Sequence, residues 1–202
     1  MLQQRHRISQ DLHDEVGATL SGISMYSHIL KQQLDNNNIT AVQNSANIIQ
    51  QNSLETVDKL NDIVWLVNPD KDSLQQLLQR LHDYANNLAV VKNIKVITRI
   101  SDDFSEILLP ENSRRHIYLF CKEAIINAIK YSEATELVFE AHINRGELQL
   151  KIADNGCGFD TRLINAGNGI SNMQQRADTL NGTISLISEV GKGTTVQLIA
   201  PI

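Results

Sequence analysis

Three polar side chains with helical spacing are the first candidates for chemistry in this sequence of 202 residues. Glu123, Asn127 and Lys130 are four and three residues apart, so on a helix they project from one face. Oxygen ligands from Asn127 and Glu123 suit Mg²⁺, and Lys130 can neutralise phosphate charge. The set therefore suits a magnesium–triphosphate, although such a polar stripe is more often only a solvated helix face.

A second group of candidates follows a predicted strand over residues 148–153, where the sequence continues Asp154-Asn155-Gly156-Cys157-Gly158. An ionised carboxylate only accepts hydrogen bonds, so Asp154 could receive an exocyclic amino group such as that of adenine. The alternating glycines would let the backbone approach a ligand closely. A plain glycine turn is the alternative interpretation.

Two further glycine motifs complete the set. Gly167-Asn168-Gly169 precedes a predicted helix from about Ile170, and Gly191-Lys192-Gly193-Thr194 precedes the last predicted strand. Glycines before a helix N-terminus expose amide donors towards an anion, with support from the helix dipole. One such motif alone is weak evidence, so the order of the motifs matters more than any single one.

The N-terminal third must be helical, because its apolar residues recur at helical spacing over 8–30 and 49–67. The polar cluster Asp35-Asn36-Asn37-Asn38 separates the two stretches, and Pro69 ends the second. Two such helices form an antiparallel hairpin that buries little by itself. A second copy completing a four-helix bundle is the simplest way to cover the apolar stripe.

After Pro69, segments with the spacing of helices are mixed with segments that alternate as strands do. We expect helices over 73–91 and from Pro110 onward, with strands over 94–100, 137–143, 147–153, 183–188 and 194–200. Such a mixture indicates a mixed sheet covered on one face by helices. The predicted fold class is therefore α+β, with one domain over 1–67, a hinge over 68–72 and a second domain over 73–202.

Composition and charge restrict which kinds of partner this protein could bind. The net charge of −5 argues against a general nucleic-acid-binding protein. Cys121 and Cys157 lack metal-ligand spacing and indicate reduced thiols. No apolar run is long enough to span a membrane. We expect a chain without membrane contact, either cytoplasmic or the cytoplasmic part of a membrane-anchored sensor.

Taken in order, the polar stripe, DNGCGF, GNGI and GKGTT resemble the N, G1, G2 and terminal glycine boxes of the GHKL ATPase superfamily. The resemblance covers nearly everything after Ser73 and implies a Bergerat-type α/β sandwich. It implies that Asn127 holds Mg²⁺ and that Asp154 binds the adenine amino group. It also gives roles to four glycines, with Gly156 and Gly158 lining the base and Gly167 and Gly169 flanking a short lid over the phosphates.

The N-terminal segment ISQDLHDEVG, residues 8–17, resembles the phosphoacceptor motif of the LHDxxG subfamily of sensor histidine kinases. This resemblance makes His13 the phosphoacceptor, and a neutral imidazole is a competent nucleophile. Asp14 can orient or deprotonate one ring nitrogen so that the other attacks the γ-phosphate. Taken alone, a histidine beside acids on a helix is more often structural or solvated.

Two other positions bear on this resemblance. Related kinases often carry glutamine five residues after the histidine, where this sequence has Ala18. Kinase activity does not depend on that residue, but phosphatase activity does, so the resemblance does not imply it here. Arg176 matches a family position too, and either a phosphate contact or a structural salt bridge would explain it.

We therefore expect a homodimeric histidine kinase core that uses ATP and Mg²⁺ to phosphorylate His13. The phosphoryl group would then pass to an aspartate in the receiver domain of a response regulator. Two alternatives stay open at this point. One is a GHKL ATPase or protein kinase acting on water or serine, and the other is a dimeric scaffold that binds nucleotide without transferring phosphate.

Overall fold

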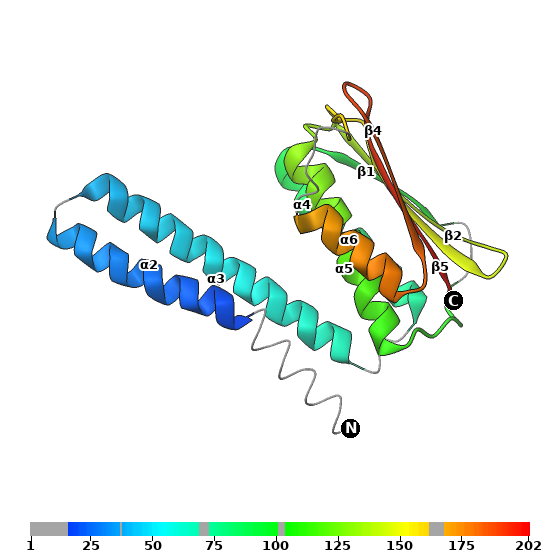
Figure 1. Ribbon diagram of the computed structural model, residues 1–202, viewed down its shortest axis with the longest axis horizontal. Helices are drawn as coiled ribbons and strands as arrows, with labels where there is room; N and C mark the ends of the chain where they lie inside the picture. The colour runs from blue at the N-terminus through cyan, green and yellow to red at the C-terminus, as the bar shows by residue number, and fades with distance from the viewer. Residues whose placement is uncertain (1–15, 37, 69–72, 101–103, 162–167) are drawn as a thin grey trace. The chain divides into compact units, whose positions relative to one another are not determined.

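The computed structural model describes residues 16–36, 38–68, 73–100, 104–161 and 168–202 (Figure 1). The chain divides into two compact units, Met1–Pro69 and Asp70–Ile202. The described part of the first unit is helical, whereas the second combines helices with one sheet. No helix in these ranges is both long enough and apolar enough to cross a membrane.

The first unit contains α2 (Gly17–Asp35) and α3 (Ile39–Val67), which lie side by side as an antiparallel hairpin (Figure 1). Its polar turn caps both helices. The Asn36 N–H donates to the Gln32 carbonyl at 3.3 Å, and Asn38 Oδ1 accepts from the Ala41 N–H at 3.2 Å. The second bond satisfies an otherwise unpaired amide at the start of α3. The predicted hairpin is therefore confirmed for α2 and α3, whereas residues 8–15 of the first predicted helix lie outside the described residues.

The seam between α2 and α3 is narrow and partly polar. Ser45 Oγ donates to Gln33 Oε1 at 2.8 Å, and Lys59 Nζ donates to Thr19 Oγ1 at 3.1 Å. The buried residues of α3 are few, and three of the five lie near its C-terminal end: Ser45, Thr56, Asp62, Ile63 and Leu66. Val57 and Val64 also belong to the predicted apolar stripe, yet they remain 54% and 68% exposed. Two helices cover only one strip of each other, so part of the stripe stays open.

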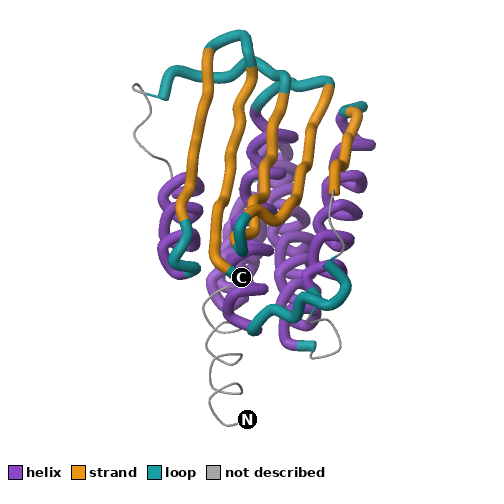
Figure 2. Tube along the Cα trace, turned by 90° about the vertical axis from the view of Figure 1, so that its right-hand side faces the viewer, coloured by secondary structure: helices purple, strands orange, loops and turns teal. Residues whose placement is uncertain are grey.

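The second unit is a five-stranded sheet covered by three helices, in the order α4 (Leu74–Lys92), β1 (Lys95–Ile100), α5 (Glu111–Tyr131), β2 (Glu136–Asn144), β3 (Glu147–Asp154), α6 (Asn168–Thr179), β4 (Thr183–Glu189) and β5 (Gly193–Pro201). The strand order is β1-β2-β3-β5-β4, parallel between β1 and β2 and antiparallel elsewhere. The strands form one layer (Figure 2), and α4, α5 and α6 cover one face (Figure 1). The predicted mixed sheet with helices on one face is confirmed.

Alternation along the strands separates a buried face from a polar one. On β3, Leu148, Leu150 and Ile152 are buried against the helices. On the opposite face, Glu140 Oε1 lies 2.6 Å from Arg99 Nη1, and Glu140 Oε2 lies 3.0 Å from Lys151 Nζ. These bonds, the one from Lys151 first, hold the pKa of Glu140 below its usual value. The buried face fixes the register, because a slip of one residue would expose it.

Candidate functional site

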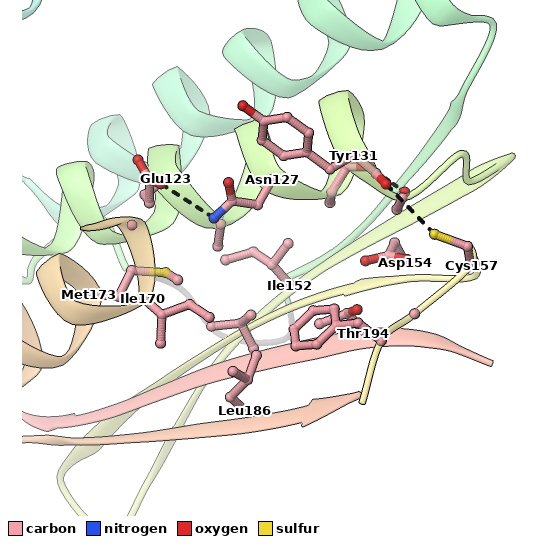
Figure 3. A pocket seen from close by; sticks show the side chains of 17 residues that line it. Glu123, Asn127, Tyr131, Ile152, Asp154, Cys157, Ile170, Met173, Leu186 and Thr194 are labelled. Atoms are coloured by element: carbon pink, nitrogen blue, oxygen red, sulfur yellow. Dashed lines mark hydrogen bonds between the residues drawn. The ribbon is translucent and has the colours of Figure 1, made fainter. Parts of the chain in front are cut away.

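A cavity of about 460 Å³ lies within the second unit, between α5 and α6 and the strands β3, β5 and β4 (Figure 3). Its polar lining comes from Glu123, Asn127, Tyr131, Ser132, Asp154, Cys157 and Thr194. Most of the remaining lining is apolar: Ala124, Ala128, Ile152, Phe159, Ile170, Met173, Leu186 and Val196. An apolar pocket with a few polar groups is typical of a site for a flat organic ligand.

Helix α5 supplies one wall of the cavity through two ridges of residues four apart. Glu123, Asn127 and Tyr131 form one ridge, and Ala124, Ala128 and Ser132 continue the other to the helix end. Asn127 Nδ2 donates to Glu123 Oε1 at 3.3 Å, so the two predicted metal ligands lie together. Lys130 was predicted on the same stripe but is exposed and does not line the cavity. Ridges of residues four apart are inclined to the helix axis. The last turn of α5 therefore presents Tyr131 and Ser132 to the cavity, and not Lys130.

Asp154 ends β3 and lines the opposite part of the cavity. Its Oδ1 accepts the Gly156 N–H at 2.9 Å. Burial raises the pKa of Asp154 above its usual value, against hydrogen bonds from the Gly156 and Thr194 backbone and from the Ser132 side chain, which lower it. The result is a carboxylate that is partly withdrawn from water, held by the Gly156 N–H, and able to accept a further hydrogen bond.

The glycines around Asp154 are needed because backbone segments meet there. A Cβ on Gly156 would overlap the Ser132 carbonyl oxygen, and one on Gly158 would overlap that of Glu189. Gly158 and Gly193 also have positive φ, of 56° and 85°. Gly158 lines the cavity, whereas Gly156 and Gly193 are buried behind it. Close contacts between backbone segments are therefore enough to require glycine at all three positions, whether or not a ligand binds nearby.

Asn155 and Ser188 hold the loops beside the cavity. Asn155 Oδ1 accepts the Thr135 N–H at 3.0 Å and the Glu136 N–H at 2.9 Å, which fastens the loop after β3 to the start of β2. Ser188 Oγ accepts the Phe159 N–H at 2.9 Å and lies 2.9 Å from Thr194 Oγ1. The middle residue of the Asp-Asn-Gly motif is thus structural, a role that its sequence position does not reveal.

Helix α6 brings the third glycine motif to the cavity. Gly169 lies in the first turn of α6, and a Cβ there would overlap Glu123 Oε1, so the helix start is packed against the Glu123–Asn127 pair. Gly167 lies outside the described residues. Arg176 lies in the last turn of α6, is half-buried and interacts with other groups, but it does not line the cavity.

The N-terminal candidates cannot be placed in the same way. His13 and Asp14 lie outside the described residues, and Ala18 lies in the first turn of α2. Both cysteines are free thiols, as expected. Cys121 is buried, which raises the pKa of its thiol far above the usual value and makes it unreactive.

Sequence reasoning missed the part that Ser132 and Thr194 play around Asp154. Thr194 was noted only as part of a glycine motif, and Ser132 was not singled out. Ser132 lies four residues after Ala128, and spacing of this kind could have indicated that both share one ridge of α5. Its carbonyl accepts the Cys157 N–H at 2.6 Å, and this contact with the loop after Asp154 depends on the packing of α5 against β3 and has no signal in the sequence.

Two family models match the chain. One, described as histidine kinase, matches residues 4–72, and the other, described as histidine kinase-, DNA gyrase B-, and HSP90-like ATPase, matches residues 112–202. The chain is 24% identical over 201 residues to the sensor histidine kinase LiaS of Bacillus subtilis. It is 26% identical over 201 residues to the oxygen sensor histidine kinase NreB of Staphylococcus carnosus. These alignments cover 99% and 98% of this chain but 54% and 56% of the relatives, so the chain spans about half their length.

Solved structures show the same fold. The histidine kinase AdeS of Acinetobacter baumannii superposes with a TM-score of 0.61 at 17% identity, covering 89% of this chain and 94% of that one. The histidine kinase domain of the blue-light activated kinase of Erythrobacter litoralis gives a TM-score of 0.56 at 16% identity, covering 97% and 94%.

Proposed function

We propose that the chain is the catalytic core of a sensor histidine kinase of a two-component system and that it phosphorylates itself on His13 with ATP. The phosphoryl group then passes to an aspartate of a response regulator. The observation that supports this most is the cavity, in which the fixed Asp154 carboxylate and the Glu123–Asn127 pair lie in one apolar site. The Asp154 carboxylate suits the hydrogen-bond donor of a base, and the Glu123–Asn127 pair suits a metal ion beside phosphates. The cavity thus offers one polar part to each end of a nucleoside triphosphate.

The adenine end of the cavity is formed around Asp154. In Figure 3, Asp154 lies towards Cys157 and Glu123 lies towards Met173. Ile152, Leu186 and Val196 offer apolar surface to a flat base. The Asp154 carboxylate accepts the hydrogen bond that the exocyclic amino group of adenine donates, so the base is recognised at that side.

The phosphate end is formed around Asn127 and Glu123. The described residues contain no cluster of three His, Cys, Asp or Glu side chains, so the protein alone does not offer a metal cage. Magnesium on a triphosphate needs only one or two protein oxygens, because phosphates and water supply the rest. The Asn127 amide nitrogen is engaged by Glu123, which leaves its amide oxygen for the cation. Bound Mg²⁺ would neutralise charge on the triphosphate, and Gly169 would present backbone amides to the phosphates.

The transfer step follows from the motif around His13. A neutral ring nitrogen of His13 attacks the γ-phosphorus, the bond from that phosphorus to the β,γ-bridging oxygen breaks, and ADP leaves. Asp14 accepts the proton from the other ring nitrogen, so the imidazole is not left with an unfavourable charge. The nitrogen–phosphorus bond formed is labile enough to pass its phosphoryl group to a carboxylate of the receiver domain.

The hairpin supports the homodimer in this proposal. Leu20, Met25, Leu54, Val57 and Val64 are large apolar residues that are more than half exposed on α2 and α3. A second hairpin packed by two-fold symmetry would cover such residues in a four-helix bundle. The boundary between the two units at Pro69 supports residues 68–72 as the hinge that brings the ATP site to His13.

The test is incubation of the chain with γ-labelled ATP and Mg²⁺, followed by acid and base treatment. We expect label that survives base and is lost in acid, and that falls to background in His13→Ala and Asn127→Ala. His28→Ala is the matched control, because His28 lies exposed on α2 and should leave labelling unchanged. Acid-stable label, or label retained in His13→Ala, would contradict the proposal. ATP hydrolysis without any label would favour the simple ATPase alternative.

A further inference from the structure

Ser188 lies near the end of β4, two residues after Leu186, so the two side chains share one face of the strand. Leu186 lines the cavity, whereas Ser188 is half-buried and does not line it. The Ser188 hydroxyl is therefore placed beside the cavity wall rather than against a ligand. Its hydrogen-bond partners indicate what it does there.

Three hydrogen bonds use the whole capacity of the Ser188 hydroxyl. Its oxygen accepts the Phe159 N–H at 2.9 Å. The hydroxyl donates to the Gly193 carbonyl at 3.2 Å and lies 2.9 Å from Thr194 Oγ1. Because a hydroxyl has one hydrogen, a Ser188 that donates to Gly193 receives the hydrogen of Thr194. Ser188 thus joins the loop after β3 to the first residues of β5.

The two cavity residues that Ser188 joins lie near Asp154. Phe159 and Thr194 both line the cavity, one from the loop after β3 and the other from β5. Thr194 pairs with Asp154 in the register of β3 and β5. Phe159 adds an aromatic ring, which suits contact with a flat base. Ser188 therefore ties together two parts of the wall at the proposed adenine end.

The backbone that follows Ser188 holds the same loop. The Gly191 N–H donates to the Cys157 carbonyl at 2.7 Å. A Cβ on Gly158 would overlap the Glu189 carbonyl oxygen, so the turn between β4 and β5 is packed tightly against this loop. The side chain of Ser188 extends the contact to the Phe159 backbone, two residues beyond Cys157.

On the basis of these contacts, and resting on the proposed ATP site, we propose that Ser188 is a positioning residue for the adenine base. Its hydroxyl holds Phe159 and Thr194 at a fixed separation, so the adenine end of the cavity keeps a shape that fits a flat base. The partners of the hydroxyl all belong to that end of the cavity. Ser188 therefore acts on nucleotide affinity and not on phosphoryl transfer.

The experiment measures autophosphorylation of the chain at varied ATP and Mg²⁺ concentrations, together with equilibrium binding of ATP and ADP. For Ser188→Ala, we expect the KM for ATP to rise about fivefold, as for a lost neutral hydrogen bond, with kcat unchanged. Binding of ADP should weaken by the same factor, because ADP carries the same base. The Mg²⁺ concentration that gives half-maximal labelling should not change.

Three variants separate positioning from loss of folding. Ser185→Ala makes the same substitution on β4, at an exposed position outside the cavity, and should change neither KM nor affinity. Ser188→Thr keeps the hydroxyl on a residue that suits a strand, and should restore most of the affinity. If Ser188→Ala does not fold, Ser188→Cys keeps the shape with a weaker hydrogen-bonding group and should raise KM by a smaller factor.

A double-mutant cycle tests the contact with Thr194. In a Thr194→Val background the pair of hydroxyls is already broken, so Ser188→Ala should weaken ATP binding less than it does in the unsubstituted chain. Additive effects of the two substitutions would contradict a role of Ser188 that acts through Thr194.

The outcomes distinguish this inference from the proposed function. A lower kcat with an unchanged KM, a changed Mg²⁺ requirement, or an equal loss in Ser185→Ala would overturn the positioning role while leaving the ATP site intact. Absence of ATP binding by the unsubstituted chain would overturn the proposed function and this inference together. A raised KM that is matched by ADP binding and restored by Ser188→Thr would support both.

Discussion

The helical hairpin and the nucleotide-binding unit cover their apolar residues in different ways. In the second unit, the inward residues of the sheet meet three helices, and Leu148, Leu150 and Phe139 are fully buried. In the hairpin, Val57 and Val64 remain more than half exposed beside a seam that is partly polar. The first arrangement closes a core within one chain, whereas the described residues of the second leave large apolar side chains exposed.

The glycines show the same difference. Gly156, Gly158 and Gly193 lie where a side chain would overlap a backbone carbonyl of another segment. In the hairpin, Gly17 has open space, and Gly22 meets only the end of the Asn52 side chain, at 3.2 Å. Tight backbone packing in the second unit fixes a cavity of defined shape, whereas these two hairpin glycines meet no backbone of another segment.

The largest effect should come from charging the exposed apolar face of the hairpin. In the proposed dimer, Val64→Asp would bury two uncompensated carboxylates, one from each copy. We therefore expect the dissociation constant of the dimer to rise by about 100-fold or more. Sedimentation equilibrium measures this constant. Val90→Asp is the control, because Val90 is 75% exposed on α4 of the other unit. An intact dimer in Val64→Asp, or equal effects of both variants, would contradict the proposed bundle.

A smaller effect should distinguish two glycines of the turn between β4 and β5. Gly191 and Gly193 have similar positive φ, 80° and 85°, but only at Gly193 would a Cβ overlap the Asp154 backbone. Gly191→Ala should lower the free energy of unfolding by about 1 kcal/mol through backbone strain alone. Gly193→Ala should lower it by about 3 kcal/mol, because overlap adds to strain, and should weaken ATP binding. Denaturant unfolding measures the free energy of unfolding of both variants. Equal losses of that free energy would show that Gly193 is not tightly packed against Asp154.

The smallest effect concerns the open face of the sheet. The pKa of Glu140 is lowered, so the folded state gains stability at neutral pH that is lost as pH falls through that lowered value. Glu140→Gln should therefore cost about 1 kcal/mol at pH 7 and less in acid, since its partners are partly exposed. Unfolding measured from pH 7 to about pH 3 tests this. Glu147→Gln, an exposed acid on β3, should leave the pH dependence unchanged.

Local sequence patterns were sufficient for the elements. Helical spacing predicted α2 and α3, and the alternation of Leu148, Leu150 and Ile152 predicted β3 with its buried face. Both patterns reflect which side of one element must avoid water, so they depend on residues close together in the chain. The order β1-β2-β3-β5-β4 could not be predicted, because it depends on which strand edges meet after the chain has crossed the sheet.

The candidate site shows where sequence reasoning ends. From the sequence, the resemblance to known kinases predicts that Glu123, Asn127 and Asp154 belong to a nucleotide-binding motif and that His13 lies in a phosphoacceptor motif, because the order of several short motifs is enough for a resemblance. Only the tertiary structure decided that Lys130 lies outside the cavity, that Asn155 fastens a loop, and that the Ser132 carbonyl holds the loop after Asp154. The physical reason is that hydrogen bonds and steric overlap act between neighbours in space, and the packing of α5 on β3 makes neighbours of residues that the chain keeps far apart.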